Sequence, residues 1–100
     1  GGVKLLKISV ILDVSNVEKQ SVSKILHKLK KYECRAFKYK NKIRLEFDFD
    51  KANSITLEEF VDILKDTTDM NVHIKVIKGK MVFKFVKEKG EPSIEIISTQ

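Results

Sequence analysis

The sequence is poor in the residues that mark disulfide-linked or zinc-binding domains. Its 100 residues include no tryptophan, one proline, four glycines and a single cysteine, Cys34. One cysteine excludes both an internal disulfide and a multi-cysteine zinc site, and this usage is typical of a reducing, cytoplasmic setting. We interpret Cys34 as a small buried strand residue, because no histidine or second cysteine lies near it in the sequence to activate a thiol.

Long hydrophobic runs are also absent. No apolar run approaches the roughly 20 residues that a helix needs to cross a bilayer, so no membrane association is expected. Residues 3–12 are too short for a signal peptide, are interrupted by two lysines and a serine, and lack a small-residue cleavage site after them. With 42% hydrophobic residues, we predict a single cytoplasmic domain over residues 1–100, and we interpret residues 1–2 as a cloning remnant.

Positive charge is what the sequence has in excess. Twenty Lys and Arg residues against fourteen Asp and Glu residues give a net charge of +6, which attracts polyanions whatever the fold. Eighteen of the twenty are lysines. The lysine ammonium is a point charge and lacks the planar, bidentate guanidinium group with which arginine reads base edges. Lysine-rich composition also arises by default in AT-rich or thermophilic genomes. Charge alone therefore favours nucleic-acid binding without establishing it.

Hydrophobic periodicity predicts six strands and two helices. Alternation with a period of two places strands at 4–13, 33–39, 43–50 and 93–98, and two more within a hairpin at 72–86 that turns near residues 78–80. Capping boxes at Ser15–Glu18 and Thr56–Glu59 predict where the two helices begin, and the apolar stripe of the first predicts an end near Tyr32. In the 72–86 hairpin one side is expected to carry Val72, Ile74, Val76, Met81, Phe83 and Phe85.

This order of elements is β-α-β-β-α-β followed by two strands. Right-handed crossovers and two helices on one face predict an α+β fold, a ferredoxin-like βαββαβ sandwich with two additional C-terminal antiparallel strands. The expected strand order is 4-1-3-2, which leaves one sheet face open. The last strands are expected either to extend the sheet or to fold across that open face.

Motifs for chemistry are missing. No phosphate-binding loop, serine hydrolase, zinc protease, cysteine redox pair or EF-hand pattern is present. In the predicted sheet Asp48 and Asp50 lie at the opposite edge from Asp13, so no two-metal carboxylate cluster is expected. His73 could approach Asp13 on the open face, as a base or as a surface pair. We predict a non-enzymatic domain without catalytic residues, metal or cofactor.

Residues 6–40 carry one family resemblance. Asp13 ends the first strand in ILDVSN, and the helix KILHKLKKYE follows. In these features the segment resembles the small ferredoxin-like subunit of the CRISPR adaptation complex. The chain departs from that family at Glu33, where the family usually has glycine, and in its second-strand sequence. The resemblance implies, as a minor alternative, a metal-dependent nuclease-like ferredoxin fold with Asp13 in its site.

The segment FKYKNKIRLEFDF (37–49) can form a hairpin in two registers. An odd loop, Lys40 to Lys42, pairs Tyr39 with Ile43 and buries both aromatic rings, each worth on the order of 2–3 kcal/mol. An even loop, Lys40-Asn41, suits the turn chemistry of asparagine and places the aromatic residues on the open face. We favour the buried register.

The even register defines the candidate nucleic-acid site. Its residues are Arg35, Phe37, Tyr39, Lys42 and Arg44, with Lys75 and Lys84 on the same face. Aromatic rings can stack on bases while neighbouring cations meet phosphates. The glycine-aromatic motifs of an RNA-recognition domain are absent in either register. We predict that the domain binds nucleic acid through lysine-rich surfaces.

The alternative function is a protein–protein or homodimerisation module, regulatory or for assembly, that uses the open sheet face. Ile11, Ile77, Val82 and Val86 are expected on the open face. Solvated monomers seldom leave such an apolar patch bare, so a second copy or another protein could cover it. Dimerisation and nucleic-acid binding are compatible, because two basic halves make a longer track for a polyanion.

Overall fold

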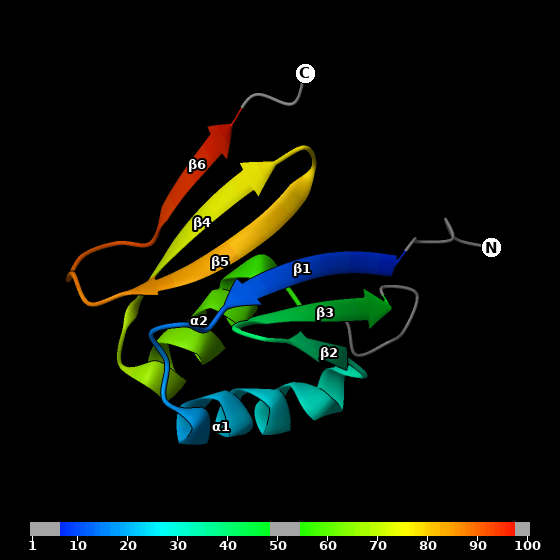
Figure 1. Ribbon diagram of the computed structural model, residues 1–100. Coiled ribbons are helices and arrows are strands. Elements are labelled where there is room, and N and C mark those ends of the chain that lie inside the picture. Colours follow the sequence, from blue (N-terminus) through cyan, green and yellow to red (C-terminus); the bar gives the residue numbers. More distant parts are fainter. Residues whose placement is uncertain (1–6, 49–54, 98–100) are drawn as a thin grey trace.

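The computed structural model describes residues 7–48 and 55–97. Its elements are β1 (Lys7–Asp13), α1 (Lys19–Leu29), the short 3-10 helix η1 (Lys30–Tyr32), β2 (Arg35–Tyr39), β3 (Lys42–Asp48), α2 (Leu57–Thr68), β4 (Asn71–Ile77), β5 (Lys80–Val86) and β6 (Ser93–Ile97). They form a mixed α+β fold in which both helices lie on one face of a six-stranded sheet (Figure 1). The predicted cloning remnant at residues 1–2, the outer ends of the first and last predicted strands, and Asp50 fall outside the described residues.

The sheet differs from the predicted order on one side of β1. The observed order is β2-β3-β1-β5-β4-β6. The predicted neighbours on the first side are confirmed, since β1 pairs antiparallel with β3 and β3 with β2. The predicted 4-1-3-2 arrangement is wrong on the other side, where β5 rather than β4 lies beside β1 and runs parallel to it. The architecture is therefore not the ferredoxin-like sandwich in its expected form.

The inner position suits β5 because of what its core face carries. Phe83 and Phe85 are both buried, and the Phe83 ring packs edge-on against Phe60 of α2 with the ring centroids 4.9 Å apart. The β4–β5 hairpin turns at Lys78-Gly79 and has the predicted facing, with Ile74 opposite Phe83. The same residues of the hairpin face the core whether β4 or β5 lies beside β1. Alternation alone therefore could not predict which of the two strands is β1's neighbour.

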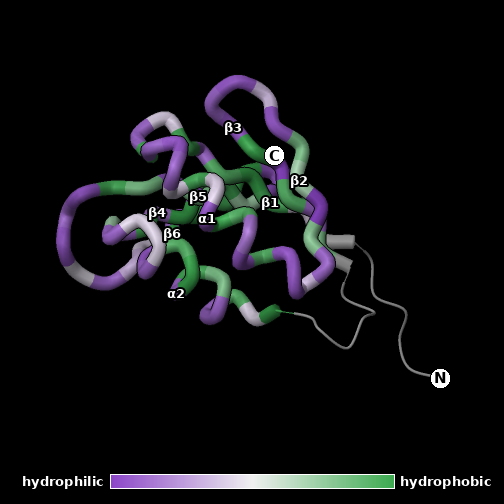
Figure 2. Tube along the Cα trace, turned by 90° about the horizontal axis from the view of Figure 1, so that it is seen from below, coloured by the Kyte–Doolittle hydropathy of each residue, from purple (hydrophilic) through white to green (hydrophobic). Residues whose placement is uncertain are grey.

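The last strand extends the sheet instead of crossing its open face. β6 pairs with β4 and runs parallel to it, so the expectation of antiparallel C-terminal strands is wrong for β6. The hydrophilic loop between β5 and β6, purple in Figure 2, passes the start of β4, where the Asn71 side-chain amide donates to the Glu91 carbonyl over 3.3 Å. Because β4 and β5 are antiparallel, this short loop brings the chain to β4 in the parallel direction.

The two predicted helix starts have different outcomes. At α2 the capping box is confirmed, because the Thr56 hydroxyl accepts from the Glu59 amide and the Glu59 carboxylate accepts from the Thr56 amide. At α1 the predicted Ser15 box is wrong, because the helix starts three residues later, with Glu18 as its N-cap and no side-chain cap. The Ser15 amide and hydroxyl both donate to the Asp13 carboxylate instead.

The observed cap predicts a difference between two small substitutions. Thr56→Ala is expected to lower the free energy of unfolding by about 1 kcal/mol, because the Glu59 amide loses its acceptor. For a domain of this size that corresponds to a melting temperature lower by roughly 4–8 °C. Ser15→Ala is the matched control and should change the melting temperature less, since Ser15 caps no helix. Thermal unfolding followed by circular dichroism measures both, and a larger loss at Ser15 would contradict the observed helix starts.

Candidate nucleic-acid interface

The β2–β3 hairpin has the even register. Tyr39 lies opposite Lys42 and Phe37 opposite Arg44, so the loop consists of Lys40 and Asn41 alone. The predicted buried register is therefore wrong. Phe37 is 45% exposed and Tyr39 72% exposed on the face of the sheet that no helix covers.

The local structure explains why burial of the rings does not determine this register. β2 is an edge strand whose helix-side residues Ala36 and Lys38 are themselves exposed, so the helices cover β3 but offer little burial to side chains of β2. The loop is held by the Asn41 carbonyl, which accepts from the Val14 amide over 2.8 Å, and by Lys40, whose φ of 54° is left-handed. Turn geometry therefore outweighs the burial that an odd loop would offer.

All seven predicted site residues lie on the open face, in two groups. Arg35, Phe37, Tyr39, Lys42 and Arg44 gather on the β2–β3 hairpin. Lys84 and Lys75 lie beyond β1, since Lys84 is opposite Asp13 and Lys75 is opposite Val82. Neighbouring strands are about 4.8 Å apart, so Lys84 lies about 10 Å from the β3 row and Lys75 one strand further. The structure thus joins five residues into one cluster and sets two lysines apart from it.

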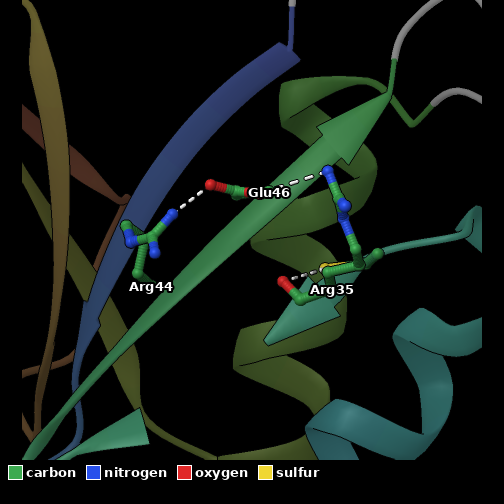
Figure 3. Close-up of polar contacts among 4 residues, drawn as sticks. Arg35, Arg44 and Glu46 are labelled. Atoms are coloured by element: carbon green, nitrogen blue, oxygen red, sulfur yellow. Dashed lines mark hydrogen bonds and ion pairs between the residues drawn. The ribbon is translucent and has the colours of Figure 1, made fainter. Parts of the chain in front are cut away.

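Glu46 is the acidic partner of the hairpin cluster. Figure 3 shows it between two guanidinium groups, with its carboxylate 3.2 Å from Arg35 and in contact with Arg44. Lys42 has a similar partner, with its ammonium 3.4 Å from the Asp13 carboxylate. The three cationic side chains are about half exposed, while the carboxylates of Glu46 and Asp13 are more buried, so the cations remain accessible to a phosphate.

Each aromatic ring of β2 has a cation beside it. The Arg44 guanidinium carbon is 4.4 Å from the centre of the Phe37 ring, and the Lys40 ammonium is 5.4 Å from the centre of the Tyr39 ring. Cations within about 6 Å of a ring face are attracted to it. Lys40 was not predicted as a site residue, because a loop residue carries no strand periodicity. Glu46, the residue that contacts both arginines, was not predicted either. The spacing Arg44-x-Glu46 on one strand face was the available signal.

Asp13 and His73 are not brought together. β5 separates them, and Lys84 lies opposite both. His73 faces the last strand instead, where it contacts the Ser93 hydroxyl and its Nε2 is 3.5 Å from Glu95. Among residues 7–48 and 55–97, no group of three His, Cys, Asp or Glu side chains could hold a metal ion.

The Asp13 carboxylate is itself already occupied. Partial burial raises its pKa, but hydrogen bonds from Ser15 and the charge and hydrogen bond of Lys42 outweigh that effect and leave the pKa below its usual value. In the strand register Asp48 lies opposite Lys7, at the other end of the β1–β3 ladder from Asp13, as predicted. Nothing in this arrangement adds support to the nuclease-like alternative.

The predicted apolar residues of the open face are present, but they are only partly exposed. Ile11, Ile77, Val82 and Val86 lie on it, each partly buried.

Cys34 precedes β2 and is partly buried against the core. Its burial raises the pKa of the thiol to about 11, so it is protonated and unreactive at neutral pH.

Comparison with known proteins identifies no relative of this chain. No family model, no curated protein and no solved structure matches it. Within the described ranges, neither helix is long and apolar enough to cross a membrane.

Proposed function

We propose that this domain binds single-stranded nucleic acid on the open face of its sheet, with the β2–β3 hairpin at the centre of the site. One observation supports this most directly: the even register leaves the Phe37 and Tyr39 rings exposed among cations. Stacking of a base on an exposed aromatic ring contributes about 1–3 kcal/mol and tolerates any base. Two such rings on one strand are enough for weak binding.

The surrounding charges supply the second part of the interaction. Arg35, Arg44 and Lys42 are held in place by Glu46 and Asp13, so their positions are ordered before a ligand arrives. The same carboxylates lower the local positive charge, which limits affinity. Lys84 and Lys75 extend the positive surface beyond β1, so that an oligonucleotide could cross the sheet. Because lysine predominates and few arginines are available for bidentate contacts to bases, we expect little sequence preference.

The test is a titration of the protein into fluorescently labelled, mixed-sequence single-stranded DNA and RNA, followed by anisotropy. At low ionic strength we expect dissociation constants in the micromolar range. Contacts to three to six phosphates should give a slope of about −2 to −4 when the logarithm of the association constant is plotted against that of the salt concentration. A flat titration at low ionic strength would contradict the proposal.

A chemical-shift map locates the site. On addition of unlabelled oligonucleotide, amide shifts should concentrate in β2 and β3 and extend to Lys84. The lysines of α1, on the opposite face, provide an internal comparison. Shifts confined to α1 would show electrostatic binding on the helix layer and would remove the open face as the site.

A further inference from the structure

β6 is an unprotected edge strand. It pairs only with β4, so its outer edge has no strand partner among residues 7–48 and 55–97, and it lies at the far side of the sheet from β2 (Figure 1). All five of its residues are exposed. Ile94 is 58% exposed and Ile96 75% exposed on the helix side of the sheet, and Ile97 is 36% exposed on the open side. Exposed edges of this kind are templates for pairing with another strand.

The other edge of the sheet is protected. β2 carries Arg35 and Lys38, and charged side chains, lysine above all, are the usual means by which proteins block edge pairing. β6 carries Glu95 as its one charged residue, and it is the one strand of the described chain without lysine or arginine. Two copies of a chain with net charge +6 repel each other on average, and β6 adds no positive charge of its own to that repulsion.

We propose that β6 pairs antiparallel with β6 of a second copy across a two-fold axis, which joins the two sheets into one. An axis perpendicular to the sheet brings these strands together antiparallel and places same-face residues opposite one another. Registers centred on Ile94 or on Ile96 set an isoleucine against its own symmetry mate. The register centred on Glu95 opposes two carboxylates and is disfavoured.

The surface next to β6 on the helix side carries an apolar band among charged residues. A groove of about 260 Å³ between α2 and β6 is lined by Leu57, Val61, Ile74, Pro92 and Ile94, and also by Glu58, Asp62, Lys65 and Glu91. Leu57 is itself 45% exposed. Isoleucines of a second β6 would lie alongside this band and cover apolar surface that the single chain leaves in water.

The pairing has a consequence for the open face. A perpendicular two-fold axis keeps both open faces on the same side of the joined sheet. The two Lys75 residues then lie three strand spacings apart, at least about 14 Å, with the two β6 strands and their Glu95 residues between them. This consequence rests on the proposed function, whereas the pairing itself does not. A longer oligonucleotide could then cross both copies and bind with higher affinity than one that spans a single face.

Sedimentation velocity over a wide concentration range tests the pairing. A short edge contact should give a monomer–dimer equilibrium in the micromolar range. The double variant Ile94→Lys/Ile96→Lys should weaken association by at least about tenfold, because it places lysines on the exposed edge. The matched control is Phe37→Ala/Tyr39→Ala on the other edge strand, which should leave association unchanged. A strictly monomeric protein, or association that survives the β6 variant, would overturn the proposal.

Hydrogen exchange gives a readout that does not depend on a variant. In the unaltered protein, amides of β6 should exchange more slowly as concentration rises, while those of β2 should not change. Concentration-independent exchange at β6 would also overturn the pairing. The two proposals fail separately: a flat oligonucleotide titration with intact association removes the proposed function alone, and oligonucleotide binding by a strict monomer removes the pairing alone.

Discussion

Replacing Phe83 with alanine is expected to lower the free energy of unfolding by about 3–5 kcal/mol. The side chain is fully buried in the middle of β5, and its ring packs edge-on against Phe60 of α2. Removing it leaves a cavity between the sheet and α2 that the neighbours can fill only in part. A loss of this size is a large share of the 5–15 kcal/mol that stabilises a typical domain. Urea unfolding followed by circular dichroism measures it.

The matched control is the same substitution at an exposed position. Phe37→Ala on β2 should cost less than about 1 kcal/mol, because its ring is about half in water and the Arg44 guanidinium lies over it. The pair therefore tests two of the structural results that differ from the predictions, the hairpin register and the inner position of β5. If Phe37→Ala were the more destabilising change, the hairpin register would be wrong. If Phe83→Ala cost little, β5 could not lie between β1 and β4.

Replacing both Phe37 and Tyr39 with alanine is expected to weaken binding to single-stranded oligonucleotides at least about thirtyfold. Each ring that stacks on a base contributes about 1–3 kcal/mol, so loss of both removes 2 kcal/mol or more. The fold should persist, since neither ring belongs to the buried core. Anisotropy titrations at one fixed salt concentration measure the change.

Three further substitutions separate stacking from charge. Tyr39→Phe keeps the ring and should retain binding within about twofold, because stacking needs the π-face and not the hydroxyl. Lys42→Ala on the open face should weaken binding more than Lys38→Ala, which lies on the opposite face of the same hairpin. Equal effects of the two lysines would indicate a diffuse charge effect. Unchanged affinity of the double alanine variant would show that bases do not stack on β2.

Some features of this protein follow from short stretches of its sequence. The start of α2 is readable because Thr56 and Glu59 satisfy each other within one helical turn. The residues of the β4–β5 hairpin that face the core can be predicted because apolar and polar residues alternate in Val72 to Val76 and in Met81 to Phe85. The turn between the two strands is marked by Gly79. In both cases the interactions that determine the structure join residues close together in the chain.

Other features depend on contacts between distant segments. Whether β4 or β5 lies beside β1 depends on how Phe83 fits against Phe60, which no periodicity can express. Ser15 reads as a helix cap, yet its hydrogen bonds go to Asp13 at the end of β1. The hairpin register likewise depends on whether the helices cover β2, and they do not, since its helix-side residues Ala36 and Lys38 are exposed.

The sequence alone thus determined the facing of the β4–β5 hairpin, the cap of α2, the positive charge and the α+β class, because these depend on composition and on neighbouring residues. Only the tertiary structure decided that Phe37 and Tyr39 stand exposed among cations, and that β6 forms an edge without lysine or arginine. The physical reason is that an exposed ring and an edge strand are defined by what does not pack against them, and that depends on the positions of all the other elements.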